Sequence, residues 1–430
     1  MFTIKKQTSF KQVLYLLIFF SLCSCSSHLS LQTNDEKISS IHLIDQNGLT
    51  ETIQSKERLK QYEHTNFLTP QPYKKVACNF GRNSQGDIRS YITTYHANGQ
   101  PRQYLEAINS RAHGKYREWF ANGIQKLEAN VIGGIADLNT TAEESWLFDG
   151  ESQAWNENGG LEALILYSKG ELQGISKYYH HNGTLWKEIP YEKGKIHGTV
   201  HIYRKDGPLL LKTDYLKNEE NGYSIRFWEK EQIASKEYYQ EGLLQEAQYF
   251  SKTGQLIGEI KEGYGQKISF SKNFPYEIQN FKNGIPEGLV QVFDENQQLH
   301  RTYHIKNGMK HGKEAEYYKN SSQAKIILNW YNGIIQGTTK TWYSNGNLES
   351  QREMTANKKH GLLSAWYENG AIMLIEEYEY DRLLKGEYFK INEITPQSRI
   401  ENGKGSALLF DANGDLIKKI SYSEGVPLSQ

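Results

Sequence analysis

The stretch YHHNGTLWKEIPYEKGKIHGTVHIYRKDG, residues 179–207, begins and ends with the same pattern, an aromatic residue four positions before the glycine of a turn. With that glycine as position zero, the pattern restarts along most of the chain. The starts are Gly99, Gly123, Gly159, Gly183, Gly207, Glu231, Gly254, Asn273, Gln297, Ser322, Gly346, Gly370, Asn392 and Gly414. Most are about 24 residues apart, which indicates an array of about fourteen repeats.

Apolar spacing within one repeat predicts strands. An aromatic residue occupies position −4, an aliphatic residue position +2 and usually an aromatic residue position +8, as in Tyr179, Leu185 and Tyr191. Positions +2 and +8 differ by an even number, so they share one face of a strand. A Gly-x-x-x-Gly at +11 and +15, as in Gly194 and Gly198, marks a second turn. The sequence therefore predicts an all-β fold, an elongated antiparallel β-meander of hairpin repeats, with the two kinds of turn at opposite edges.

The irregular repeats supply the candidate binding residues. The step from Gly123 to Gly159 is long, which indicates an insertion within 131–142, and the steps at Gly254 and Asn392 are short. Insertions in repeat proteins usually form surface loops, so deletion of residues 132–141 is expected to leave the array folded. Exposed aromatic residues there could anchor a partner. The candidates are Trp146, Leu147, Phe148, Tyr264, Phe270 and Phe274.

The N-terminus has the pattern of a targeting segment. Three lysines precede a short apolar run, residues 13–22, and Leu22-Cys23-Ser24-Cys25 resembles the lipobox of bacterial lipoproteins. That resemblance implies that Cys25 is lipidated and becomes the first residue of the mature chain. Ser26 after it resembles the pattern that sorts to the outer membrane of a Gram-negative cell. A simple cleaved signal peptide and an uncleaved signal anchor are the alternatives.

Four segments follow from these patterns. They are a signal peptide (1–24), a flexible tether after lipidated Cys25 (25–40), an N-terminal cap (41–94) and the repeat array (95–430). In the cap, the sequence predicts a hairpin over residues 41–53 and two helical turns over residues 55–62. It also predicts a strand pair formed by residues 73–80 and 87–95. Cys78 is the only cysteine after Cys25, so it cannot form a disulfide within the chain.

Composition and motifs argue against several functions. Fifty basic and fifty acidic residues give zero net charge, so nucleic acid is not an expected partner. The chain lacks the common hydrolase, zinc-protease and dinucleotide motifs. The His-Gly pairs at His113, His197, His311 and His360 fall in separate repeats, too far apart for one zinc ion. We therefore predict no enzyme activity, no metal and no cofactor.

The recurring aromatic-x-x-Asn-Gly-x-Leu pattern, best seen in WYSNGNLESQREM at 342–354, resembles the MORN-variant repeat over residues 95–424. Bacterial proteins with such repeats are often grouped with YwqK-type antitoxins, and MORN repeats elsewhere are linked to scaffolding and membrane association. An exported lipoprotein cannot neutralise a cytoplasmic toxin. The resemblance and the N-terminus therefore favour an envelope-anchored scaffold for protein binding, with a second copy as one candidate partner. The alternatives are a structural lipid- or peptidoglycan-associated lipoprotein, an antitoxin-like or immunity-type binding protein, and an enzyme with a composite site in the irregular repeats.

The lipobox resemblance makes a direct prediction. Substitution of Cys25→Ala removes the acylated thiol and should abolish fatty-acid labelling and membrane partitioning of the mature chain. Metabolic labelling with a palmitate analogue followed by detergent phase separation measures both. Unchanged labelling and partitioning in the variant would show that Cys25 is not the anchor.

Overall fold

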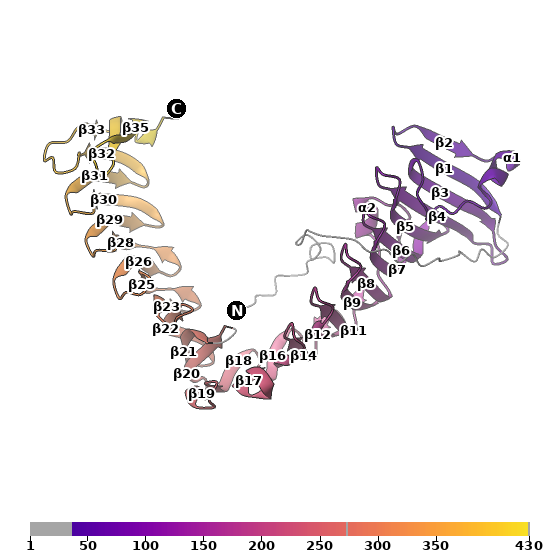
Figure 1. Cartoon of the computed structure of the whole chain (residues 1–430), viewed down its shortest axis with the longest axis horizontal. Coiled ribbons are helices and arrows are strands. Elements are labelled where there is room, and N and C mark those ends of the chain that lie inside the picture. The colour runs from indigo at the N-terminus through magenta and orange to yellow at the C-terminus, as the bar shows by residue number, and fades with distance from the viewer. Residues whose placement is uncertain (1–36, 272–273, 429–430) are drawn as a thin grey trace. The chain divides into compact units, whose positions relative to one another are not determined.

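The computed structural model describes residues 37–271 and 274–428. The predicted signal peptide, Cys25 and most of the tether lie outside the described residues. Within them, 36 strands form an open antiparallel sheet in which strands pair with their neighbours in sequence (Figure 1). The predicted fold class, an all-β antiparallel meander of hairpins, is confirmed.

The chain divides into two compact units, the first ending at Glu219 and the second beginning at Glu220. The elements of the first unit are β1 (Ile38–Asp45), β2 (Thr50–Ile53), α1 (Lys56–Leu59), η2 (Lys60–Tyr62), β3 (Tyr73–Arg82), β4 (Ile88–Tyr95), β5 (Pro101–Ile108), β6 (Arg111–Trp119), β7 (Gln125–Ile135), α2 (Thr140–Glu144), β8 (Gly150–Trp155), β9 (Leu161–Ser168), β10 (Glu171–Leu172), β11 (Gly174–Tyr179), β12 (Leu185–Glu192), β13 (Lys195–Ile196), β14 (Gly198–Tyr203) and β15 (Leu209–Leu216).

Strand β16 (Glu219–Phe227) starts at the boundary residue, and the remaining elements belong to the second unit. They are η3 (Glu229–Glu231), β17 (Ile233–Gln240), β18 (Leu243–Phe250), β19 (Leu256–Lys261), β20 (Tyr264–Phe270), β21 (Pro275–Lys282), β22 (Ile285–Phe293), β23 (Leu299–Lys306), β24 (Met309–Lys310), β25 (Gly312–Tyr317), β26 (Ala324–Tyr331), β27 (Ile334–Ile335), β28 (Gly337–Trp342), β29 (Leu348–Thr355), β30 (Lys358–Trp366), β31 (Ile372–Glu379), β32 (Arg382–Tyr388), β33 (Ser398–Glu401), β34 (Lys404–Phe410), β35 (Leu416–Ser423) and β36 (Val426–Pro427).

Residues 179–207 show how one repeat folds. Strand β12 ends in a two-residue turn, Lys193 and Gly194, whose φ angles of 49° and 74° suit the right-handed twist of a hairpin. The second glycine of the motif is not in this turn. Gly198 instead begins β14 with a φ of 105°, and a Cβ there would lie 3.3 Å from the Pro190 side chain. The close approach explains a glycine at this position, and the irregularity before it separates β13 from β14.

The backbone supports the predicted repeat phase where glycine is missing at position zero. Glu231, Gln297 and Asn392 have φ angles of 61°, 61° and 60°, the left-handed conformation that glycine adopts in the regular repeats. At Ser322 the turn differs, because the hydrogen bond from Tyr318 N–H to Gln323 O encloses one more residue. The left-handed residue there is Asn320.

Side chains of the Asn-Gly turns connect each repeat to the next. The Asn182 carboxamide oxygen accepts from Thr184 N–H in its own turn, while its amide group donates to Lys205 O at 3.0 Å in the next turn. The same bond to the following turn occurs at Asn98, Asn122 and Asn345. Each asparagine therefore fixes its own turn and its neighbour at once.

A polar ring at position −3 makes a second connection. Tyr343 donates its hydroxyl to Trp366 O at 2.8 Å, and Tyr367 donates to Phe389 O at 2.9 Å. Trp228 donates its indole N–H to Phe250 O at 3.0 Å in the same way. The acceptor is the carbonyl of the next repeat's residue −4 for Tyr343 and Trp228, and of its residue −3 for Tyr367. We call these bonds, together with those of the asparagines, the turn ladder.

The opposite edge is connected through the backbone. The N–H of most turns donates to a carbonyl of the preceding hairpin, as from Gly194 to Leu172 O at 2.9 Å and from Gly333 to Lys310 O at 2.8 Å. Both edges of the meander are therefore hydrogen-bonded from repeat to repeat.

The second unit contains a duplicated module, residues 228–284 and 367–425. In the first copy, Leu244 N–H donates to Gly284 O and Gly284 N–H donates to Gly263 O. Leu383, Gly425 and Gly403 make the same two bonds in the second copy. A Cβ on Gly263 would lie 2.5 Å from Gly284 N, and one on Gly403 would lie 2.5 Å from Gly425 N. Three hairpin ends meet here too closely for any other residue.

The N-terminal segment folds as the sequence predicts. Strands β1 and β2 form the expected hairpin, the helical turns begin at Ser55, which caps α1, and β3 pairs with both β1 and β4. The apolar side chains of these strands and of Leu59 enclose a small core that includes Cys78.

The turn ladder predicts a measurable stability difference. Tyr343→Phe deletes one hydrogen bond to Trp366 O and should lower the free energy of unfolding by about 1 kcal/mol. Tyr331→Phe is the matched control because Tyr331 is 61 % exposed, and it should change the same quantity by less than about 0.5 kcal/mol. Urea denaturation measures both, and equal effects would contradict a stabilising role for the ladder.

Candidate interaction surface

The insertion after β7 is part of a core. Strand β7 runs to Ile135, and helix α2, capped by the Asn139 side chain, follows. Trp146 is 6 % exposed, contacts the Tyr116 ring at 4.8 Å between centroids and donates its indole N–H to Ile135 O. The expectation of an exposed Trp146 is wrong, because the insertion folds back over the sheet. Deletion of 132–141 would remove part of this core, so it cannot be expected to leave the array intact.

The other two candidates of the insertion differ in exposure. Leu147 is exposed. Phe148 is half-buried, bridges to Val131 through the backbone and packs against Tyr167 with 5.5 Å between ring centroids. Of this group, only Leu147 offers a large apolar side chain to a partner.

The second group of candidates also separates into buried and exposed residues. Phe270 is buried in a cluster with Trp228 and Tyr249, and Phe274 is half-buried at the turn that follows. The exposed positions expected for these two residues are therefore wrong. Tyr264 is 52 % exposed at the start of β20, and its hydroxyl donates to Asn283 Oδ1.

Tyr264 belongs to a row that sequence reading did not find. Five consecutive turns on one edge of the second unit are each followed directly by an exposed apolar residue, and the exposed fractions lie between 40 and 52 %. We call these residues the apolar turn row: Leu243, Tyr264, Ile285, Met309 and Ile334. At the same place, other turns have a charged residue: Glu171, Lys195, Glu219, Lys358, Arg382 and Lys404.

Short distances bring the turns of the row close to one another. A Cβ on Gly284 would lie 3.0 Å from Leu243 Cβ, and one on Gly333 would lie 3.9 Å from the Met309 side chain. Asn307 N–H donates to the Glu287 carboxylate at 3.1 Å, which joins the two hairpins in between. The row is an apolar strip bordered by polar turn residues, the arrangement of an interface core with a polar rim.

The duplicated module shows that its hydrogen bonds do not need an apolar residue at the places of Leu243 and Tyr264. Arg382, Lys404 and Val426 follow the three turns of the second copy, where Leu243, Tyr264 and Ile285 follow those of the first. Both copies make the same hydrogen bonds between hairpin ends. The copies therefore make these bonds whether an apolar or a charged residue follows the first two turns, and an apolar residue follows the third turn in both.

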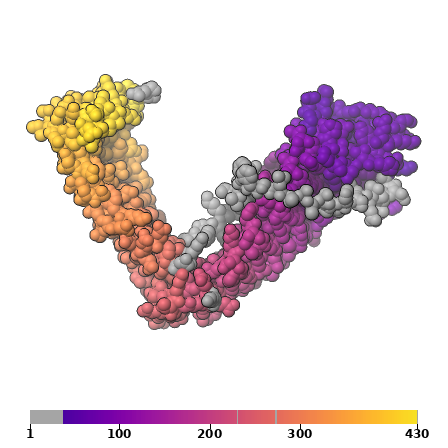
Figure 2. Space-filling view, viewed as in Figure 1, coloured from indigo at the N-terminus to yellow at the C-terminus, as the bar shows by residue number. Residues whose placement is uncertain are grey.

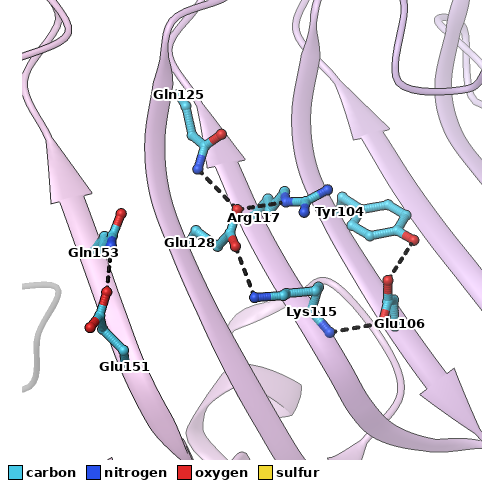
Figure 3. Close-up of polar contacts among 8 residues, drawn as sticks. All are labelled: Tyr104, Glu106, Lys115, Arg117, Gln125, Glu128, Glu151 and Gln153. Carbon is cyan, nitrogen blue, oxygen red and sulfur yellow. Dashed lines mark hydrogen bonds and ion pairs between the residues drawn. The ribbon is translucent and has the colours of Figure 1, made fainter. Parts of the chain in front are cut away.

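The charged side chains of a cluster on β6 and β7 bind one another. Glu128 on β7 binds Lys115 Nζ at 2.9 Å and Arg117 Nε at 2.9 Å, both from β6, as Figure 3 shows. Burial alone would raise the pKa of the Glu128 carboxyl, but the hydrogen bonds and charges of these two residues outweigh it and lower the pKa. This carboxylate is held ionised by the sheet and is not placed to move a proton.

Two buried glutamates recur in the duplicated module. Glu376 accepts the hydroxyls of Tyr378 and Tyr388 at 2.9 and 2.7 Å, and Glu237 accepts two tyrosine hydroxyls in the same geometry. Burial and the Glu376 charge raise the pKa of both Tyr378 and Tyr388. Each glutamate uses both oxygens within the fold, which suits a structural role.

The surface of the described residues has shallow hollows. A shallow hollow of about 430 Å³ lies between two adjacent turns and is lined by Asp294, His300 and Tyr317, among others. Across the described ranges, no three His, Cys, Asp or Glu residues are grouped to hold a metal ion. His311 and His360 lie against the rings of Tyr331 and Tyr380 in separate hairpins. No helix among the residues with described structure is long and apolar enough to span a membrane.

The fold and these surfaces define a β-hairpin repeat protein. The family model described as the MORN repeat variant matches residues 172–193 and 335–355, and each match covers one Asn-Gly turn and the strands on both sides of it. The chain therefore contains MORN-variant repeats at these two places. No curated protein matches it.

Two solved structures are similar to the chain at low identity. The "Crystal Structure of TcdB2-TccC3-TEV" is 11 % identical with a TM-score of 0.13, and the match covers 91 % of this chain and 26 % of that one. The "Crystal Structure of TcdB2-TccC3 without hypervariable C-terminal region" is 10 % identical with a TM-score of 0.14, covering 90 % and 26 %. The chain thus spans about a quarter of the length of these proteins.

Buried tyrosines predict a loss of stability at alkaline pH. Burial, then the charge of Tyr191, raises the pKa of Tyr167 from 10.0 to about 12. Above pH 10 the unfolded chain releases this proton while the folded chain retains it, so the free energy of unfolding falls as the pH rises towards 12. Thermal unfolding at pH 9, 10 and 11 should show the decline, and Tyr167→Phe should flatten it. A melting temperature that does not change over this range would contradict the burial of these hydroxyls.

Proposed function

We propose that this protein is a lipid-anchored scaffold of the bacterial cell envelope that binds a protein partner through the apolar turn row. The observation that carries the proposal is the contrast between the two module copies. Both fold with the same connections, yet only the first has Leu243 and Tyr264 where the second has Arg382 and Lys404. An exposed apolar strip that these hydrogen bonds do not require marks an interaction site.

The composition of the row suits a protein surface. Tyrosine, methionine and isoleucine supply large contact areas, and tyrosine and methionine are enriched in the cores of interfaces. Asn283, Asn307 and Asn332 lie in the turns beside it and supply hydrogen-bonding groups for a polar rim. A protein partner that presents a complementary apolar strip is therefore favoured over peptidoglycan, whose recognition depends on polar contacts.

The envelope location rests on the N-terminal sequence. A basic start, a short apolar run and Leu22-Cys23-Ser24-Cys25 support export and acylation at Cys25. Residues 26–40 are polar and would serve as a tether between the anchor and the cap. An exported scaffold also argues against an antitoxin acting in the cytoplasm.

The difference between the two module copies allows a direct test of the row's role in binding. The double substitution Leu243→Arg and Tyr264→Lys gives the first copy the residues of the second. It should change the free energy of unfolding by less than about 0.5 kcal/mol and reduce recovery of a cross-linked envelope partner by about tenfold. Affinity purification after cross-linking in intact cells, at equal abundance, measures the recovery.

The matched control is Arg382→Glu with Lys404→Glu, at the equivalent turns of the second copy. This variant should retain partner recovery, because its substitutions lie outside the row. Equal losses in both variants would assign binding to another surface. Unchanged recovery in the Leu243→Arg, Tyr264→Lys variant would refute the role of the row.

A further inference from the structure

Four Asn-Gly pairs of the second unit form the same kind of two-residue turn. They are Asn283-Gly284, Asn307-Gly308, Asn332-Gly333 and Asn402-Gly403. Their asparagine φ angles lie between 48° and 53° and their glycine φ angles between 73° and 79°. Positive φ at both residues is the geometry that Asn-Gly favours in tight hairpins. Figure 2 draws the region of the second pair in orange. Because the four backbones match, any difference in their chemistry comes from their surroundings.

The glycine N–H is hydrogen-bonded in three of these turns. Gly284, Gly333 and Gly403 donate to backbone carbonyl oxygens at 3.0, 2.8 and 2.9 Å. Among the described residues, Gly308 N–H has no acceptor within hydrogen-bond distance. Nothing in this part of the chain therefore holds the Gly308 nitrogen in place.

The side-chain amide of Asn307 is likewise unbonded. Asn283 Oδ1 accepts the hydroxyl of Tyr264, and Asn332 Oδ1 lies 3.2 Å from His311 Nδ1. The Asn307 carboxamide forms no hydrogen bond to any residue that the structure describes. Its Cγ can therefore turn towards the next backbone nitrogen without breaking a bond.

The space around Gly308 permits a ring to close there. No atom of the described residues lies within 4 Å of the place where a Cβ on Gly308 would be. At Gly284 the same position is 3.0 Å from Leu243 Cβ, and at Gly403 it is 2.5 Å from Gly425 N. Both residues of the 307–308 turn are exposed, so water reaches them.

We propose that Asn307 is a modification site, where the side chain deamidates through a cyclic imide ahead of the other three turns. Asparagine is a chemically labile residue. The Gly308 nitrogen forms a bond to Asn307 Cγ, the Cγ–Nδ2 bond breaks, and ammonia leaves with the proton of the Gly308 N–H. Water then adds to either carbonyl of the imide and opens it to aspartate or to isoaspartate. Water is the only co-reactant in this sequence.

Deamidation here changes the apolar turn row, a consequence that rests on the proposed function of that row. The new carboxylate lies directly before Met309, in the turn whose N–H donates to the Glu287 carboxylate at 3.1 Å. Two carboxylates at neighbouring turns repel each other, and isoaspartate adds a methylene group to the turn. The modification therefore replaces a polar rim amide with a charge and weakens partner binding.

Peptide mapping by mass spectrometry measures the modification on the purified full chain. In mildly alkaline buffer, Asn307 should deamidate about tenfold faster than Asn283, Asn332 and Asn402, with isoaspartate among the products. In concentrated urea the hydrogen bonds of the folded turns are lost, so the four rates should agree within about twofold. Asn307→Gln keeps an amide but requires a larger ring, and it should show no modification at this position.

Cell experiments test the effect on the row with a matched pair of variants. Asn307→Asp carries the charge of the product, and Asn402→Asp makes the same change at an equivalent turn outside the row. Asn307→Asp should reduce recovery of the cross-linked envelope partner by about fivefold, while Asn402→Asp should retain it.

Two kinds of result would overturn the modification site. One is equal rates at the four asparagines of the folded chain, or the same excess at Asn307 in urea. The other is aspartate at position 307 without isoaspartate, which would show direct hydrolysis in place of the cyclic route.

The row and the modification can fail separately. Recovery lost in the Leu243→Arg, Tyr264→Lys variant but retained in Asn307→Asp would refute the effect of deamidation on binding and leave the row in place. Recovery retained in both variants would refute the role of the row, whereas the deamidation rates of the purified chain would still decide the modification site.

Discussion

The hydrogen bond from a turn side chain of one repeat to a backbone carbonyl of the next is the interaction on which this structure depends. A hairpin of two strands is marginal alone, and stacked hairpins enclose little volume. Asn182 and Tyr343 show the two forms of the bond, one from the amide beside the glycine and one from the ring at position −3. Such bonds fix the spacing of neighbouring hairpins, while the strands between them contribute the backbone ladder.

Where the hairpins are irregular, buried apolar cores form between them. The insertion buries Trp146 against Tyr116, and each module copy buries a leucine and a glutamate between two tyrosines. The irregular repeats therefore stabilise the array. The exposed residues of the apolar turn row follow the turns at the sheet edge and are not part of these cores.

Periodicity made the strands, both turn edges and the repeat phase predictable, since position zero keeps a left-handed backbone even at Glu231 and Gln297. The role of position −3 was missed because its residue type varies from repeat to repeat, and the histidines, tyrosines and tryptophan found there share only an N–H or O–H group. Trp146 and Phe270 were misjudged because aromaticity does not distinguish a buried ring from an exposed one. The apolar turn row had a readable signal in the residue after the second turn, at position +12 in four of its repeats and +10 in the short one, which is apolar there and charged in most other repeats.

The central claim is that this row binds a partner, and that the hydrogen bonds of the fold do not require its apolar residues at 243 and 264. Site-specific photocross-linking in intact cells tests it most directly, with benzoylphenylalanine placed at Met309 or, as the control, at Lys358 after the next turn but one. The account predicts a discrete cross-linked protein from position 309 and none from position 358. Equal cross-linking from both positions, or none from position 309 in cells where the chain is present, would contradict it.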